Sequence, residues 1–151
     1  MAISTQINSP VEYIKSTVVL SSANIKAMYA TPVLMIPAQG TNTIIVFHDV
    51  FYEYVYTLPA YTGSDGNGNF VLQYGNTIHG GSANIAMFSP SLLSNTQNIV
   101  TQSSELNLNL TGSISSIINT GIYASNTTLP YITGNGLVNV TMFYSIINTI
   151  T

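Results

Sequence analysis

TIIVFHDVFYEYVYT, residues 43–57, is the longest run of β-branched and aromatic residues in the chain. Successive side chains of a strand point to opposite faces, so this run has two sets of alternating positions. One face carries Ile44, Val46, His48, Val50, Tyr52, Tyr54 and Tyr56, and the other carries Ile45, Phe47, Asp49, Phe51, Glu53 and Val55. Both faces are largely apolar, which predicts a strand that is covered on both sides. Because the run is long for one strand, we also expect a bulge or a bend within it.

The same alternation recurs elsewhere in the chain. Residues 138–146, 106–110 and 70–74 each place apolar side chains at every second position, which predicts further strands. Turns rich in Gly, Pro and Asn separate these runs. Ser22 is the expected N-cap of one short helix that ends by Tyr29.

These elements together predict an all-β protein. We expect a jelly-roll-like antiparallel β-sandwich of roughly eight strands, with one short helix. Residues 1–20 are expected to form an extended N-terminal arm, and residues 21–151 a single sandwich domain. At 151 residues, one domain with a sizeable core is the ordinary outcome.

The chain is unusually poor in charge. Only 5% of its residues are charged, against about 25% in a typical soluble domain. Lys15 and Lys26 are the only basic residues, there is no Cys, and the net charge is -3. This argues against nucleic-acid binding, attachment to anionic membranes, disulfides and thiolate metal sites. The first residues carry no basic and apolar segments of a secretory signal, so we expect none.

A few residues could carry chemistry. Asp65–Asn69 begins like a calcium-binding loop, but Phe70 and Asn76 stand where that loop needs Gly and Glu. Asp49 and Glu53 share a face of the expected strand, about 13 Å apart, which is too far for a pair of glycosidase carboxylates.

The two histidines offer little more. In a regular strand His48 points away from Asp49, and His79 lies in a glycine-rich loop beside Ser82. No G-x-S-x-G motif accompanies them. We therefore expect no catalytic residues, no metal site, no cofactor and no enzyme activity.

Tyrosine is abundant, with ten copies in the chain. Tyr52, Tyr54 and Tyr56 share one face of the long run, and a tyrosine stripe suits a subunit interface. Tyr13 and Ile14, at the end of the expected arm, are further interface candidates. Because tyrosine rings also stack on sugars, a carbohydrate-binding surface stays open as an alternative.

Four segments carry a resemblance to a known group of proteins. They read SSANIKAMYATPV at 21–33, MIPAQG at 35–40, NTGIYASN at 119–126 and TGNGLVNV at 133–140. In this order they resemble small β-rich virion proteins of tailed bacteriophages, in which an IKAL-x-x-TPV-x-LIPAPG stretch leads into a jelly-roll-like domain. Gln39 departs from that pattern, because it stands where a second proline is expected.

The resemblance implies a component of a phage particle and brings no catalytic residue with it. The low charge, the extended arm and the β-rich core favour a capsid cement or decoration protein. Its expected location is the virion, after synthesis in the host cytoplasm. Its expected partners are two further copies of itself, in a homotrimer, and the major capsid protein, with no nucleic acid and no membrane. The alternative is a receptor- or carbohydrate-binding module of a phage tail or head fibre.

Overall fold

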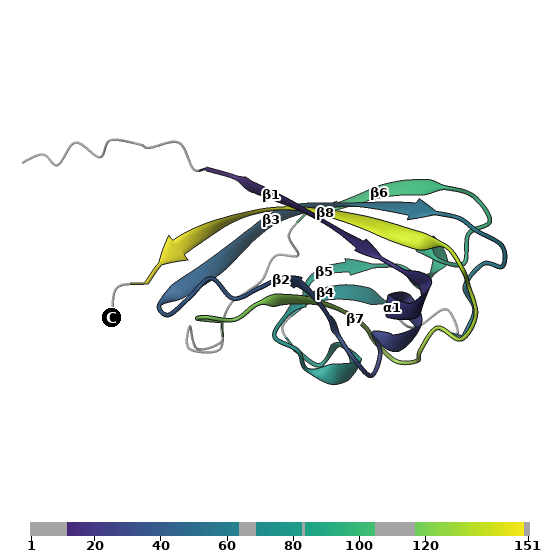
Figure 1. Cartoon of the computed structure of the whole chain (residues 1–151), viewed down its shortest axis with the longest axis horizontal. Coiled ribbons are helices and arrows are strands. Elements are labelled where there is room, and N and C mark those ends of the chain that lie inside the picture. Colours follow the sequence, from purple (N-terminus) through teal and green to yellow (C-terminus); the bar gives the residue numbers. More distant parts are fainter. Residues whose placement is uncertain (1–11, 64–68, 83, 105–116, 150–151) are drawn as a thin grey trace, which may run out of the picture.

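The computed structural model describes residues 12–63, 69–82, 84–104 and 117–149. They form two antiparallel sheets packed face to face, with one short α-helix at one end (Figure 1). This confirms the predicted all-β sandwich. Within the described residues, no helix is long and apolar enough to cross a membrane.

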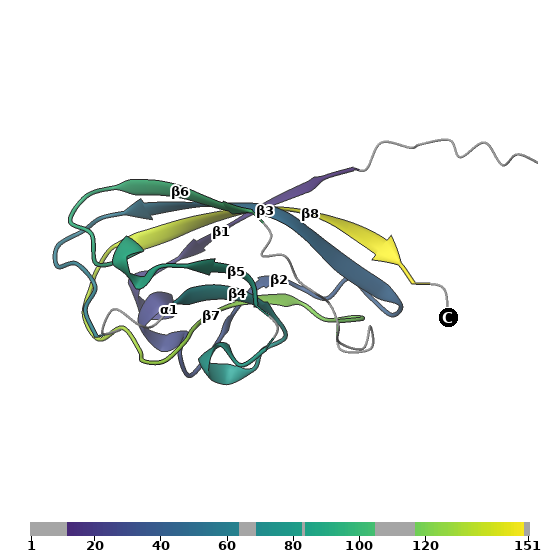
Figure 2. The ribbon, with the colours of Figure 1, turned by 180° about the vertical axis from the view of Figure 1, so that it is seen from behind.

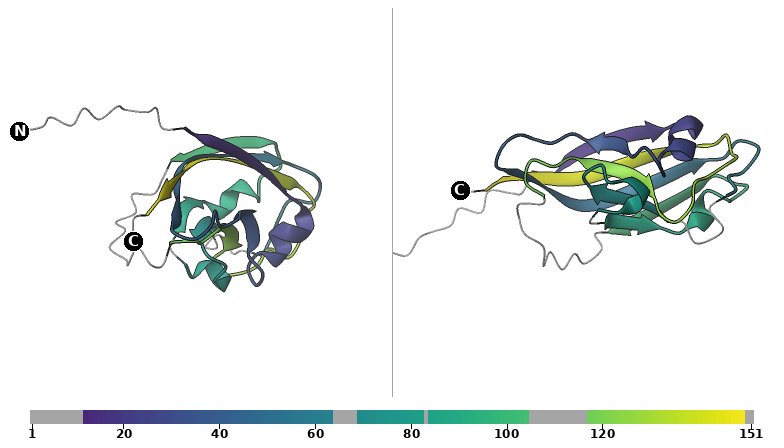
Figure 3. Two further views of the ribbon diagram at one scale, coloured as in Figure 1. Left: turned by 60° about the vertical axis from the view of Figure 1, so that its left-hand side comes forward. Right: turned by 90° about the horizontal axis from the view of Figure 1, so that it is seen from below.

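Each sheet has four strands. Sheet A holds, in spatial order, β1 (Ile14–Leu20), β8 (Leu137–Asn148), β3 (Thr43–Val55) and β6 (Ile99–Ser104). Sheet B holds β2 (Val33–Ile36), β7 (Ile122–Asn126), β4 (Phe70–Tyr74) and β5 (Asn84–Phe88). Figures 2 and 3 show the same two layers from behind, obliquely and from below.

The strands pair in a nested order. β1 pairs with β8, β2 with β7, β3 with β6, and β4 with β5. The chain is therefore arranged as one long antiparallel hairpin that is rolled into two layers, as in jelly-roll-like sandwiches. Two further pairings, β3 with β8 and β4 with β7, complete the two sheets.

A bulge divides β3, as its length predicted. Its register against β8 shifts between Phe47 and Asp49, which leaves His48 as the extra residue. Before the bulge, Ile45 and Phe47 are almost fully buried, and Ile44 is buried as well, whereas after it the buried side chains are those of the even-numbered residues, from Val50 onward. The two faces expected for a regular strand are thus exchanged halfway along β3.

The core lies between the inner faces of the two sheets. From β8, Val138, Val140, Met142 and Tyr144 are buried as predicted, whereas Ile146, expected on the same face, is exposed beyond the end of the core. Sheet B contributes buried side chains from all four of its strands. The expected strand at 106–110 lies outside the described residues.

The helix is slightly shorter than expected, and its cap lies one residue earlier. α1 spans Ser22–Ala27, and its N-cap is Ser21 instead of Ser22. The Ser21 side chain accepts a hydrogen bond from the Asn24 N–H, and the Asn24 side chain accepts one from the Ser21 N–H. Ile25 anchors the helix in the core.

The central strands of sheet B are covered on their outer face by the chain itself, whereas Leu34 on β2 and Met87 on β5 stay exposed. Residues 75–82, which include the 3-10 turn η1 (Ile78–Gly80), fold back over β4. The buried Gln73 amide donates to the carbonyls of Gly75 (3.1 Å) and Thr77 (2.7 Å). Because these bonds satisfy the amide nitrogen, a polar side chain is tolerated in a wholly buried strand.

Part of the expected N-terminal arm belongs to the sandwich. Residues 14–20 form β1 and pair with β8 along their whole length. The arm therefore stays a prediction only for residues that precede β1, and residues 1–11 lie outside the described residues.

Candidate interaction surface

The outer face of sheet A is open across the described residues, in contrast to the outer face of the central strands of sheet B (Figure 1). It consists of Tyr13, Lys15, Thr17 and Val19 beside or on β1, Asn139, Thr141 and Phe143 on β8, Asp49, Phe51 and Glu53 on β3, and Val100 and Gln102 on β6. Tyr13, Val19 and Val100 are more than half exposed, and Phe51 is 37% exposed. Apolar groups in this number on one face are typical of an interaction surface.

The strand register arranges this face in rows that run across the sheet. In one row Lys15 pairs with Phe143, which in turn pairs with Asp49. In the next row Thr17 pairs with Thr141, and Thr141 with Phe51. Each row thus sets a ring beside polar side chains.

Most polar side chains on this face form hydrogen bonds with one another. Gln102 Nε2 donates to Asp49 Oδ2 (2.5 Å), and Asn139 Nδ2 donates to Glu53 Oε2 (2.8 Å). The hydroxyls of Thr17 and Thr141 lie 2.9 Å apart in a hydrogen bond. These contacts fix the carboxylates in place without neutralising their charge.

A shallow depression lies near one end of this face. Tyr13, His48, Asp49, Phe51 and Phe143 line it. The Tyr13 and His48 rings meet edge to face with centroids 4.7 Å apart, and the Phe51 and Phe143 rings do so at 6.0 Å. His48 was expected to point away from Asp49, but the bulge brings both residues to the same depression.

The interface candidates from the sequence fall in different places. Tyr52 and Tyr54 are fully buried in the core, where their side chains are out of reach of another chain, and Tyr56 is half-buried. Tyr52 packs against Phe70 and Phe88 of sheet B, so the bulge has turned the stripe inward. Tyr13 is 61% exposed and Ile14 is half-buried.

Burial also sets the ionisation of these tyrosines. Desolvation raises the pKa of Tyr52 well above its ordinary value. For Tyr54, burial raises the pKa first, and the neighbouring Tyr56 raises it further. Both phenols are therefore neutral over the physiological pH range.

Of the residues considered for catalysis, His48 and Asp49 line one depression, whereas His79 contacts Tyr29. Asp49 and Glu53 share the outer face, as expected, but each carboxylate is bound by an amide side chain. His48 Nε2 lies 2.9 Å from the hydroxyl oxygen of Ser145, while His79 stacks on Tyr29 with ring centroids 4.1 Å apart. Across the described part of the chain, no group of three or more His, Cys, Asp or Glu side chains could hold a metal ion.

The calcium-like loop cannot be placed. Residues 64–68 lie outside the described residues, and Asn69 hydrogen-bonds Thr127 through its backbone.

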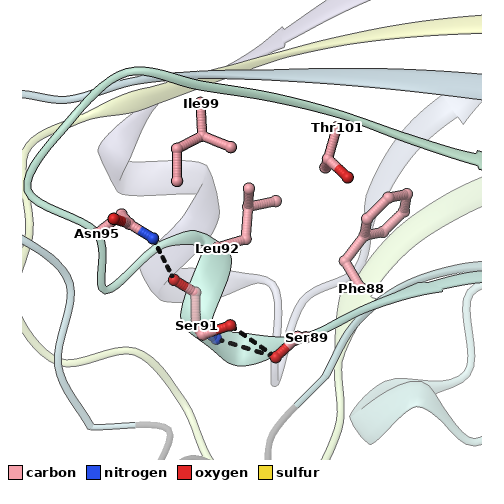
Figure 4. A pocket seen from close by; sticks show the side chains of 7 residues that line it. All are labelled: Phe88, Ser89, Ser91, Leu92, Asn95, Ile99 and Thr101. Carbon is pink, nitrogen blue, oxygen red and sulfur yellow. Dashed lines mark hydrogen bonds between the residues drawn. The ribbon is translucent and has the colours of Figure 1, made fainter.

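A second depression lies where the edges of the two sheets approach each other (Figure 4). Phe88, Leu92, Ile99 and Thr101 line it, together with a turn that contains the 3-10 element η2 (Pro90–Leu92). Polar groups of that turn bond within the turn. The Ser89 and Ser91 hydroxyls lie 2.8 Å apart, and Asn95 Nδ2 donates to the Ser91 carbonyl. These bonds shape the turn that closes the sandwich edge.

The fold of the chain is similar to that of a chain in one solved structure. No family model and no curated protein matches the chain. The chain is similar to one in a solved structure described as "Cyanophage Pam1 capsid asymmetric unit", with a TM-score of 0.45 and 14% sequence identity. The similarity covers 96% of this chain and 96% of that chain.

Proposed function

We propose that this chain is a non-enzymatic structural protein of a phage virion, and specifically a capsid cement or decoration protein. In this role it forms a homotrimer and clamps neighbouring copies of the major capsid protein on the outside of the head. Its role is mechanical. The surface area that it buries at subunit junctions stabilises the shell against the pressure of the packaged DNA.

The observation that carries this proposal is the open outer face of sheet A. It exposes apolar residues, among them Val19 and Phe51. Although Lys15, Asp49 and Glu53 also lie on it, only 5% of the chain is charged, so most of the surface of the protein costs little desolvation to cover. At about 25 cal/mol per Å² of apolar area, such contacts contribute a few kcal/mol per junction before association costs. The phage-like segments described from the sequence support the same role.

Particles with and without the protein test the proposal. Both should assemble the same major shell, but particles that lack the protein should release DNA at a lower temperature. Sedimentation of the purified protein should give a trimer of the 16.2 kDa chain. Equal DNA-release temperatures together with lost host adsorption would contradict a cement role.

The second candidate is a receptor- or carbohydrate-binding module. The depression lined by Tyr13, His48, Phe51 and Phe143 favours it, because aromatic rings beside the Asp49 carboxylate offer both stacking and hydrogen bonding to a sugar. Binding of host surface glycans, abolished by Phe51→Ala and retained by Val100→Ala, would support this candidate over the first.

A further inference from the structure

We propose that the outer face of sheet A binds the same face of a second copy of this chain, about a two-fold axis that runs parallel to β8, midway between the two packed faces. This contact uses the same face that carries the proposed virion role, so one copy cannot make both contacts at once, and the three-fold contacts of a trimer would need other surfaces. A face that binds itself must place complementary groups opposite each other after a half-turn. The rows across sheet A meet this condition when the axis runs along β8.

Charge gives the first complementarity. β1 and β3 flank β8 on opposite sides, and Lys15, Phe143 and Asp49 form one row across them. A half-turn about β8 exchanges the two flanks, so Lys15 comes to lie opposite Asp49 of the second copy, twice in the dimer. Packed sheets lie about 10 Å apart, which the extended Lys and Asp side chains together can span.

Size gives the second complementarity. In the next row Thr17 and Phe51 flank Thr141. The same half-turn sets Thr17 opposite Phe51 of the second copy, a small side chain against a large one. Facing sheets pack best when large and small residues alternate in this way.

A different axis gives a worse match. If the axis ran between β8 and β3, at the centre of the four strands, Phe143 would lie over Asp49 of the second copy. Lys15 would then lose its carboxylate partner, and a charge would be covered by a phenyl ring at a desolvation cost. The axis along β8 places Glu53 opposite Val19 of the second copy, but it keeps the two Lys15–Asp49 pairs that the other axis loses, and this pairing favours it.

The contact area is modest. Seven residue steps along three strands cover roughly 23 Å by 14 Å, about 320 Å² per copy, which is less than half of the roughly 800 Å² per partner of a standard interface. We expect a weak and reversible dimer that sedimentation at low concentration can miss. A covalent trap is therefore the suitable assay.

The absence of cysteine from the chain makes the trap simple. Thr141→Cys places a single thiol on the proposed axis, and Val100→Cys places one on β6, on the same face but far from the axis. Sheets about 10 Å apart are too distant for a direct disulfide, so the reagent is a short bis-maleimide. We expect Thr141→Cys to give a cross-linked species of twice the chain mass, and Val100→Cys to give at least five-fold less.

Charge reversal then tests the pairing itself. In the Thr141→Cys background, Lys15→Asp and Asp49→Lys should each lower the cross-linked yield at least five-fold, and the two changes together should restore it. Circular dichroism should show that every variant keeps the β-sandwich. This readout also separates a fold defect from a lost contact.

Four results would overturn the inference. They are equal cross-linking of the two cysteine variants, no cross-linking of Thr141→Cys, charge reversal without effect, and protection of the introduced thiol by glycans without any dimer. The last would assign the face to a sugar. A trimer without the Thr141→Cys cross-link would leave the virion proposal standing and remove this one.

Discussion

Replacing Tyr52 by Phe should stabilise the protein. The Tyr52 side chain is fully buried, and its hydroxyl has no hydrogen-bond partner among the described residues. Its ring packs against Phe88 with centroids 3.6 Å apart and against Phe70 at 5.1 Å. The substitution removes only the hydroxyl, so both ring contacts survive.

The magnitude follows from the cost of an unsatisfied polar group. A buried donor without a partner costs about 1–3 kcal/mol. A small cavity left by the hydroxyl offsets part of this, so we expect a gain of about 1 kcal/mol. For a chain of 151 residues the entropy of unfolding is about 0.3 kcal/mol/K, which converts the gain into a rise in Tm of about 3 °C.

Tyr74→Phe is the matched control. The Tyr74 hydroxyl is also buried, but it donates to the backbone carbonyl of Ile45 (2.5 Å). Losing that bond should lower the free energy of unfolding by about 1 kcal/mol. Urea and thermal unfolding, followed by circular dichroism at one protein concentration, measure both variants. Destabilisation by Tyr52→Phe as large as that by Tyr74→Phe would refute the reasoning, because the hydroxyl would then have to be satisfied.

The remaining predictions concern alkaline pH, the helix cap and one glycine. Burial raises the pKa of Tyr54 and Tyr61, so the unfolded chain loses these protons first. The stability conferred by the two neutral phenols is fully present below about pH 10 and should fall as the pH rises above it, by at most about 1.4 kcal/mol per pH unit for each tyrosine, as urea titrations between about pH 8 and 11.5 can measure. Ser21→Ala should cost about 1 kcal/mol in thermal unfolding and Ser22→Ala much less, since Ser21 is the N-cap, and the reverse order would contradict the cap assignment. Gly136→Ala should destabilise by about 1–3 kcal/mol in urea, because a Cβ there would lie 2.5 Å from Tyr54 Cε2, and an unchanged midpoint would count against this packing.

Much of the fold was predictable because alternation is a local signal. The alternation of β8 required only that one side of the strand face a core. The side chains of Val138, Val140, Met142 and Tyr144 do so. The pairing partners were not predictable in this way. Which strand lies beside β8 depends on contacts between residues more than 80 positions apart, such as Val50 and Met142, and no local pattern records them.

The interaction surface was harder to predict, because a single extra residue in β3 decides which side chains of the strand are exposed. The bulge at His48 exchanges the faces of β3, which buries Tyr52 and brings Phe51 and Asp49 to the surface. The length of the run indicated that a bulge was present but not where it lay. A shift by one residue moves every following side chain to the other face of a sheet. The tyrosine stripe was therefore assigned to an interface, whereas the structure places most of it in the core.

The position of β8 between β1 and β3 also has a consequence for biosynthesis. The ribosome releases β1 and β3 well before β8, yet these two strands meet only through it. Until β8 emerges, the nascent chain holds strands with unsatisfied edges and an uncovered apolar side, the features that promote aggregation during translation. Completion of sheet A is therefore a late event in synthesis, and stalled or shortened chains that lack β8 should be targets for chaperones and proteases.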